Sequence, residues 1–179
     1  MSETQDPRQQ ALESLNQGGS GFAAGTLVIT KDGQGFGKKP IEEIRVGDWV
    51  VSDPDDYILP TPRAPRKRNE IVFRQVTKTF VTDDQPVSHV TVWDFAADIE
   101  ETIRVTPNHP FYEEDIGRWV PVSQMGFGSR LVNAVFGNIL VGKVEHEVER
   151  ARVYNFEVDE FHTYYVSRLA IWVHNHCAQ

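Results

Sequence analysis

Short runs of apolar and β-branched residues, separated by turn residues, make up most of the chain after residue 25. Several runs alternate Val or Ile with polar residues, which is the period of a half-buried strand. No apolar pattern of period 3.6 continues over a dozen residues after Ser20, so the chain is predicted to be all-β. The predicted strands cover residues 26–30, 44–52, 70–81, 87–95, 101–106, 130–135, 139–147, 151–158, 163–166 and 170–174.

Turn residues predict how these strands connect. Asp32-Gly33 and Asp83-Asp84 are candidates for two-residue hairpin turns. Segment 53–68 contains four prolines, which lack a backbone donor, so it is predicted to be a mobile loop and not a central strand. The two β-rich halves, before and after Met125, permit a pseudo-symmetric arrangement.

Residues 1–20 differ from the rest of the chain. Asp6 and Pro7 suit a helix start and Gly18-Gly19 suits a stop, but the apolar face between them is too short to stabilise a helix alone. We therefore expect an upstream flanking segment over 1–20, one compact domain over 21–175 and a downstream remnant over 176–179.

Composition narrows the range of partners. The chain of 179 residues carries 18 Lys and Arg against 26 Asp and Glu, a formal charge of −8, so polyanions are repelled and nucleic acid is not an expected partner. The basic cluster Arg63–Arg68 is interpreted as a solvated loop. The single cysteine, Cys177, excludes an internal disulfide. No long apolar run is present, so we expect a soluble monomer without a membrane partner, compatible with a piece of a larger secreted protein.

The end of the chain holds a candidate self-cleavage site. The side-chain amide of Asn175 can attack its own backbone carbonyl and break the bond to His176, but it is a poor nucleophile with a poor leaving group. His174 and His162 are candidates to assist the leaving nitrogen and the attacking amide. His-Asn alone is a common pair, and a turn is then the simpler interpretation. Its place at the end of an apolar strand favours cleavage.

A second candidate motif, Thr106-Pro107-Asn108-His109-Pro110, directly follows a predicted strand. The flanking prolines stiffen a turn that presents a hydroxyl, an amide and an imidazole, groups suited to acyl transfer at a peptide bond. Taken alone, the motif is better explained as a strand-ending turn with incidental polar groups.

A family resemblance joins these motifs. Segments Gly21–Val28 and Pro40–Val50 resemble the opening of Hint (Hedgehog/intein) domains, the Thr106–His109 turn resembles the family's central Thr-x-x-His block, and Val153–Asn175 resembles its two closing blocks. The resemblance spans residues 21–175 in four ordered blocks. It implies a flat, horseshoe-shaped all-β fold with pseudo-two-fold β subdomains, which brings both ends of the domain into one site.

The resemblance also implies roles for single residues. Family chemistry begins when a leading cysteine attacks the preceding carbonyl, and Gly21 stands in that place. His109 would assist this step with Thr106 and Asn108 as supporting donors, while His162, His174 and Asn175 would perform the C-terminal step. The domain would act in cis on its own flanking segments without a cofactor.

Departures from the family pattern alter this expectation. Gly21 has no nucleophile, and Ser20 lies one residue too early to replace it. His176 follows Asn175 where splicing needs Cys, Ser or Thr, and Cys177 is one position late. The pattern is therefore closer to bacterial intein-like domains and the Hint domains of polymorphic toxins. The missing nucleophile is interpreted as a Cys-to-Gly substitution that traps the uncleaved precursor, and a naturally degenerate copy is the alternative. Asn155 occupies a place where many inteins carry an acid, so it is a possible site residue.

Two alternatives remain from the sequence. A non-catalytic, degenerate Hint module would use the same cleft to bind a partner peptide, or would serve as a linker domain. The second alternative is a zinc site, because the C-terminal half contains ligand types that suit the ion. Their spacing is not that of a structural zinc motif, so no metal is expected. Its candidate ligands are His109, His162, His174, His176 and Cys177.

Overall fold

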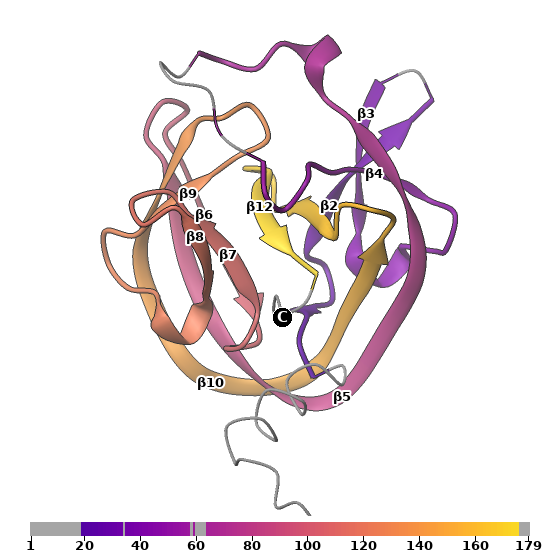
Figure 1. Ribbon diagram of the computed structural model, residues 1–179. Coiled ribbons are helices and arrows are strands. Elements are labelled where there is room, and N and C mark those ends of the chain that lie inside the picture. The colour runs from indigo at the N-terminus through magenta and orange to yellow at the C-terminus, as the bar shows by residue number, and fades with distance from the viewer. Residues whose placement is uncertain (1–18, 34, 58, 60–63, 176–179) are drawn as a thin grey trace, which may run out of the picture.

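The computed structural model describes residues 19–33, 35–57, 59 and 64–175, whose strands form one strongly curved antiparallel sheet. Two long strands, β5 and β10, sweep around the outside as a horseshoe, and the last strand, β12, lies inside it (Figure 1). Two expected parts of the chain lie outside the described residues: positions 1–18 of the upstream flanking segment, with its helix start and stop signals, and the downstream remnant 176–179.

Short strands connected by tight turns fill the space between the two long ones. Helical structure in the described residues is confined to three single 3₁₀ turns, which agrees with the all-β prediction. The elements are β1 (Phe22–Ala23), β2 (Leu27–Asp32), β3 (Gly35–Pro40), η1 (Ile41–Glu43), β4 (Trp49–Val51), η2 (Arg68–Glu70), β5 (Phe73–Asp94), β6 (Ile99–Val105), β7 (Pro110–Glu113), β8 (Arg118–Pro121), η3 (Val122–Gln124), β9 (Arg130–Val132), β10 (Asn138–Val158), β11 (Thr163–Val166) and β12 (Ile171–His174).

The two long strands correct one prediction from the sequence. Asp83-Asp84 is not a hairpin turn, because both residues lie within the 22-residue β5, which stays paired with the 21-residue β10 on either side of them. Asp84 (φ 49°) in β5 and Glu147 (φ 46°) in β10 adopt left-handed conformations, each beside its own shift in register. Such bulges bend a strand and increase its twist, so the ribbon curves here and does not reverse.

Other elements agree with the sequence or were missed for identifiable reasons. Asp32 pairs with Gly35, which confirms a hairpin here, although Asp32 ends β2 and the turn therefore begins one residue later than the predicted Asp32-Gly33. The second strand of that hairpin, β3, was not predicted because its sequence is rich in Gly and Lys. The strands β7 and β8 also escaped prediction, since four residues each are too few to show a period.

The interior of the horseshoe is filled by aromatic and branched side chains. Phe22, from the two-residue β1, is fully buried with Phe111, Phe156 and Tyr164 in the larger core cluster. A smaller cluster around Tyr165 and Trp172 packs beside it. Burying aromatic side chains contributes much of the hydrophobic free energy of a small domain. β1 is therefore fixed mainly by the burial of Phe22, because so short a strand makes few backbone hydrogen bonds.

The proline-rich segment is anchored, contrary to its interpretation as a mobile, solvated loop. Its described residues form no strand, as predicted, but Arg66 is buried and bonds both carboxylate oxygens of Asp53 at 2.6 and 2.7 Å, with 3% of each side chain exposed. The hydroxyl of Tyr165 also donates to Asp53, at 2.6 Å. The solvated interpretation of the basic cluster is therefore wrong at Arg66, although Lys67 and Arg68 are exposed.

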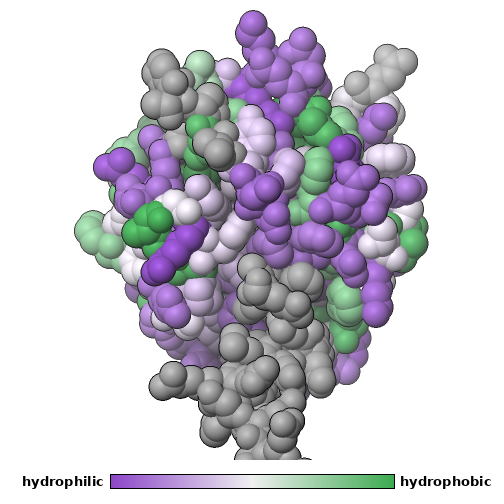
Figure 2. Space-filling view, viewed as in Figure 1, coloured by the Kyte–Doolittle hydropathy of each residue, from purple (hydrophilic) through white to green (hydrophobic). Residues whose placement is uncertain are grey.

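Hydrophilic and apolar side chains are interspersed on the face seen in Figure 2, without one dominant apolar area among the coloured residues. Over the described ranges, no helix has the length and apolar character needed to cross a membrane.

The buried ion pair leads to a stability prediction. Replacing Arg66 by Ala leaves the Asp53 carboxylate buried without its cation, so the free energy of unfolding should fall by about 3–5 kcal/mol. Urea unfolding followed by tryptophan fluorescence measures this change. Lys67→Ala, one residue away and exposed, is the matched control, and equal unfolding midpoints for the two variants would show that the pair does not anchor the segment.

Candidate active site

The N-terminal junction lies in the centre of the fold because β1 is inserted between β10 and β6. Thr106, the residue after β6, makes two hydrogen bonds with Gly21. Its backbone N–H donates to the Gly21 carbonyl, and its hydroxyl oxygen accepts from the Gly21 N–H, both at 3.0 Å. The Ser20–Gly21 peptide nitrogen is thus held by the side chain of the predicted central motif.

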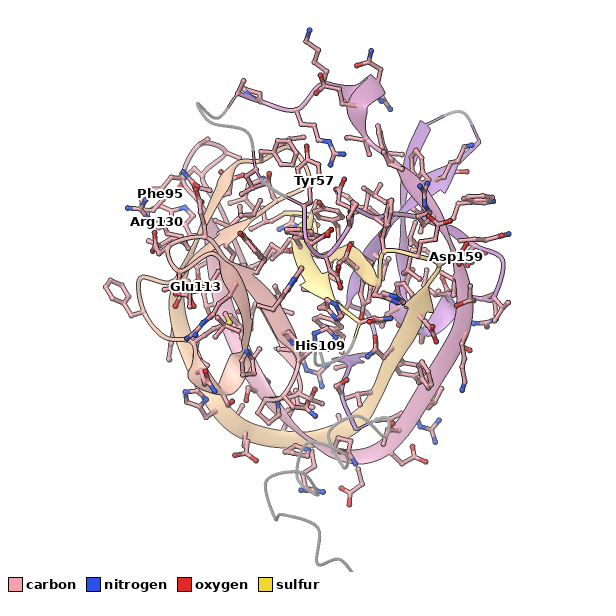
Figure 3. All side chains as sticks on the ribbon, in the orientation of Figure 1. Tyr57, Phe95, His109, Glu113, Arg130 and Asp159 are labelled. Atoms are coloured by element: carbon pink, nitrogen blue, oxygen red, sulfur yellow. The ribbon has the colours of Figure 1, made fainter. Side chains whose placement is uncertain are left out.

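His109 lies near the centre of the molecule (Figure 3), against Phe22, the residue after Gly21. A turn closed by the bond from its N–H to the Thr106 carbonyl positions it, with Asn108 half-buried in the same turn. The His109 ring is fully buried, its centroid is 4.4 Å from that of Phe22, and its Nε2 is 3.4 Å from the Tyr164 hydroxyl. The predicted motif therefore faces the junction, with Thr106 in direct contact and His109 against the next residue.

The C-terminal junction is built by the last two strands. Thr163 pairs with His174 across β11 and β12, and the Asn175 N–H donates to the His162 carbonyl at 2.9 Å. The rings of His162 and His174 have centroids 6.5 Å apart. Asn175 is only 3% exposed, and its Oδ1 has no hydrogen-bond partner within the described part of the chain. Both predicted histidines therefore lie next to the predicted scissile residue.

Asn155 on β10 joins the two junctions. Its Nδ2 donates to the Ser20 hydroxyl oxygen at 3.2 Å and to the Asn175 backbone carbonyl at 2.5 Å. Its Oδ1 accepts from the Phe156 N–H at 2.9 Å and from the Tyr164 hydroxyl at 2.7 Å. The Asn155 amide thus donates two hydrogen bonds and accepts two. Because the Phe156 N–H and the Tyr164 hydroxyl both donate to the same atom of Asn155, that atom is the oxygen.

Tyr164 is a site residue that the sequence analysis missed. Burial raises the pKa of its phenol well above the usual value, so the hydroxyl stays protonated at neutral pH and can donate to Asn155. The strand period predicted that Tyr164 is buried, but no pattern in the sequence indicates its partner.

Asp55 is a second residue that the sequence analysis missed. Its carboxylate lies 3.1 Å from Nε2 of His174, whose side chain is 2% exposed. The indole N–H of Trp119 donates to the Asp55 carbonyl at 3.0 Å, and the Trp119 ring also packs edge-on against His174. Asp55 belongs to the proline-rich segment and carries no motif, so only the fold reveals this contact.

Gly21 occupies a place with no room for a side chain. A Cβ atom built on its backbone would lie 2.4 Å from the carbonyl oxygen and 2.8 Å from the carbonyl carbon of Tyr154. Contacts this short with backbone atoms require a shift of β1 or β10. A cysteine at this position therefore does not fit the present backbone.

No metal site is formed by the described residues. They contain no group of three or more His, Cys, Asp or Glu side chains placed to hold an ion, and two ligands of the zinc alternative, His176 and Cys177, lie outside them.

Comparison with known proteins supports the fold. The solved structures similar to this chain include a bacterial intein-like domain from Clostridium thermocellum (30% identity, 87% of this chain and 98% of that one, TM-score 0.65). The gp41-1 intein (20% identity, 87% and 98%, TM-score 0.64) and a DnaB intein from Synechocystis sp. PCC 6803 (13% identity, 88% and 99%, TM-score 0.66) share the fold. No curated protein matched by sequence.

The curved sheet and these matches define a Hint-type domain, the class that carries out protein autoprocessing or splicing. Residues 27–176 match the pretoxin Hint domain family, and the chain belongs to that family.

The tight fit at Gly21 leads to a prediction that separates sterics from chemistry. Gly21→Ala adds only a methyl group, which overpacks the contact with Tyr154 and should lower the free energy of unfolding by about 1–3 kcal/mol. Chemical denaturation measures it. Gly25→Ala has open space around its Cβ, so it reports the cost of a positive φ without a clash, at +88° against +158° for Gly21. An unchanged free energy of unfolding in Gly21→Ala would contradict the steric argument.

Proposed function

We propose that this domain is a single-turnover, self-cleaving domain that cuts after Asn175, with its N-terminal step absent. The observation that carries the proposal is the arrangement around Asn175. Its nucleophilic side chain is buried, its carbonyl accepts a hydrogen bond from Asn155, and two histidines adjoin it. A buried amide next to its own polarised carbonyl, beside groups able to move protons, suits cyclisation better than simple packing.

The step is an internal acyl transfer. The Asn175 Nδ2 forms a bond to its own carbonyl carbon, and the bond from that carbon to the nitrogen of His176 breaks. Nδ2 loses one proton and the leaving nitrogen gains one, so the products are a C-terminal succinimide and a free amine. In this proposal His174 donates to the leaving nitrogen, and His162 assists the attacking amide.

Asp55 is the positioning residue for His174 in this scheme. Its carboxylate accepts from Nε2 at 3.1 Å, which fixes the ring orientation. Because the Nε2 proton is held by Asp55, the proton given to the leaving nitrogen comes from Nδ1 of His174. The buried Asp53–Arg66 pair, two residues away, holds the backbone from which Asp55 extends. The anchored proline-rich segment thus supports the C-terminal site.

The upstream half of the site retains its supporting groups without the nucleophile. Thr106 still binds the junction nitrogen and His109 still lies against Phe22, but Gly21 offers no atom that could form a thioester or ester. Because His176 cannot accept an acyl group in place of Cys, Ser or Thr, the downstream part is released and not ligated. Given the pretoxin family, we propose that the domain releases a downstream segment of a larger protein.

The absent nucleophile predicts that thiols do not cleave the chain. With dithiothreitol, the protein should give no cut between Ser20 and Gly21, because no thioester forms for the reagent to intercept. Intact-mass analysis tests this, and a thiol adduct of the fragment 1–20 would disprove it. Gly21→Cys restores the nucleophile and is the positive comparison, with Gly21→Ala reporting the steric effect alone.

The C-terminal step predicts slow release of residues 176–179. Mass spectrometry over time should show this loss from the unaltered chain and none from Asn175→Ala. His174→Ala and His162→Ala should each slow release by roughly a hundredfold or more, and Asp55→Ala by about tenfold, since it disturbs only orientation.

Asp56→Ala, at the neighbouring residue, is the control for Asp55→Ala. Since the family's C-terminal step is often coupled to the N-terminal one, the same series is repeated in the Gly21→Cys background. Equal release with and without Asn175 in that background would show that Asn175 is not the scissile residue. Because cysteine at position 21 strains the backbone, the Gly21→Cys protein is first compared with the unaltered chain by circular dichroism. A mass that never changes in a correctly folded Gly21→Cys protein would favour the non-catalytic, peptide-binding alternative.

A further inference from the structure

Among the described residues, the side-chain amide of Asn155 contacts both the upstream and the downstream junction. It is 7% exposed, and one Nδ2 atom donates to the upstream residue, Ser20, and to the carbonyl of Asn175. Ser20 itself is 4% exposed. The residues given a catalytic role above each serve one junction, whereas Asn155 contacts both.

The direction of these hydrogen bonds is fixed by the surroundings. The Phe156 N–H can only donate, and burial keeps the Tyr164 phenol protonated, so the side of Asn155 that faces them must be the oxygen. The opposite side must then be Nδ2. Asn155 therefore presents an N–H group, and not a lone pair, to the Asn175 carbonyl.

An N–H in this position stabilises charge that develops during cleavage. When Nδ2 of Asn175 attacks the carbonyl carbon, the carbonyl oxygen gains negative charge, and a fixed donor in a buried site lowers the energy of that state. We propose that Asn155 is the oxyanion donor of the C-terminal step, and that the Ser20 hydroxyl orients it, so the upstream residue tunes cleavage downstream. This inference rests on the proposed function and adds a role and a regulator to it.

An ionised acid at position 155 would lack this ability. A carboxylate has the shape of the amide but no N–H, so it would place negative charge beside the forming oxyanion. Asn155→Asp therefore removes the donor with little change of volume. Because a protonated carboxyl can donate one hydrogen bond, the defect should shrink as the pH falls towards the carboxyl pKa.

The kinetic test measures release of residues 176–179 by intact mass from pH 4 to pH 8. Asn155→Asp should slow release about a hundredfold near neutral pH relative to Asn69→Asp, an exposed control that makes the same chemical change. The ratio of the two rates should narrow at acid pH. Ser20→Ala should slow release severalfold, since the amide keeps its donor but loses one of the contacts that orient it.

The outcomes separate this inference from the proposed function. Release that requires Asn175 but is equally fast in Asn155→Asp and Asn69→Asp overturns the inference alone. A constant ratio across pH likewise overturns the donor role, because a purely structural defect would not follow carboxyl titration. Absence of Asn175-dependent release in every background overturns both.

A second measurement tests the bridge without cleavage. In ¹⁵N-labelled Asn175→Ala, which keeps the backbone carbonyl, both side-chain amide protons of Asn155 should exchange slowly with solvent. Ser20→Ala in the same background should speed exchange of one proton more than of the other. Fast exchange of both protons in the Asn175→Ala protein without the Ser20 substitution would show that the Asn155 amide does not bond to both junctions.

Discussion

The insertion of β1 between β6 and β10 is the constraint on which the site depends. Two residues of strand can hold a junction in the middle of a sheet only because Phe22 is fully buried and brings its own backbone with it. Burial of this ring places Gly21 against Thr106 and packs His109 beside it. On the other side of β1, β10 carries Asn155 to the same point. Burial of the Phe22 side chain therefore helps to set the positions of Thr106 and His109 in the turn after β6 and of Asn155 on β10.

Much of the fold could be predicted from the chain, because alternation of apolar and polar residues is a local property. The boundaries of β11 were predicted correctly, and those of β12 nearly so, since both strands are continuous apolar runs. The prediction failed at Asp83-Asp84, because residues that favour a hairpin turn also favour a bulge. Only the pairing of β5 with β10 along the whole ribbon decides between these structures.

The candidate site shows the same division. Its motif residues were found because each has a recognisable neighbourhood in the sequence, as with Thr106 and His109 beside two prolines. Asp55 and Tyr164 were not found, because their roles arise from contacts that follow no spacing rule. Asp55 contacts His174, which is 119 positions away in the sequence, and Tyr164 contacts Asn155, which is 9 positions away. The buried state of Arg66 was missed for the same reason, since a basic run in a proline-rich segment normally remains in water.

The absence of space at Gly21 limits what one substitution can do there. With the Tyr154 backbone pressed against the position of a missing Cβ, cysteine at this position adds a thiol but not a backbone able to accept it. A second change in β1 or β10 is needed to open that space. Engineering an upstream cut into this chain is therefore a problem of backbone packing as well as of choosing a nucleophile.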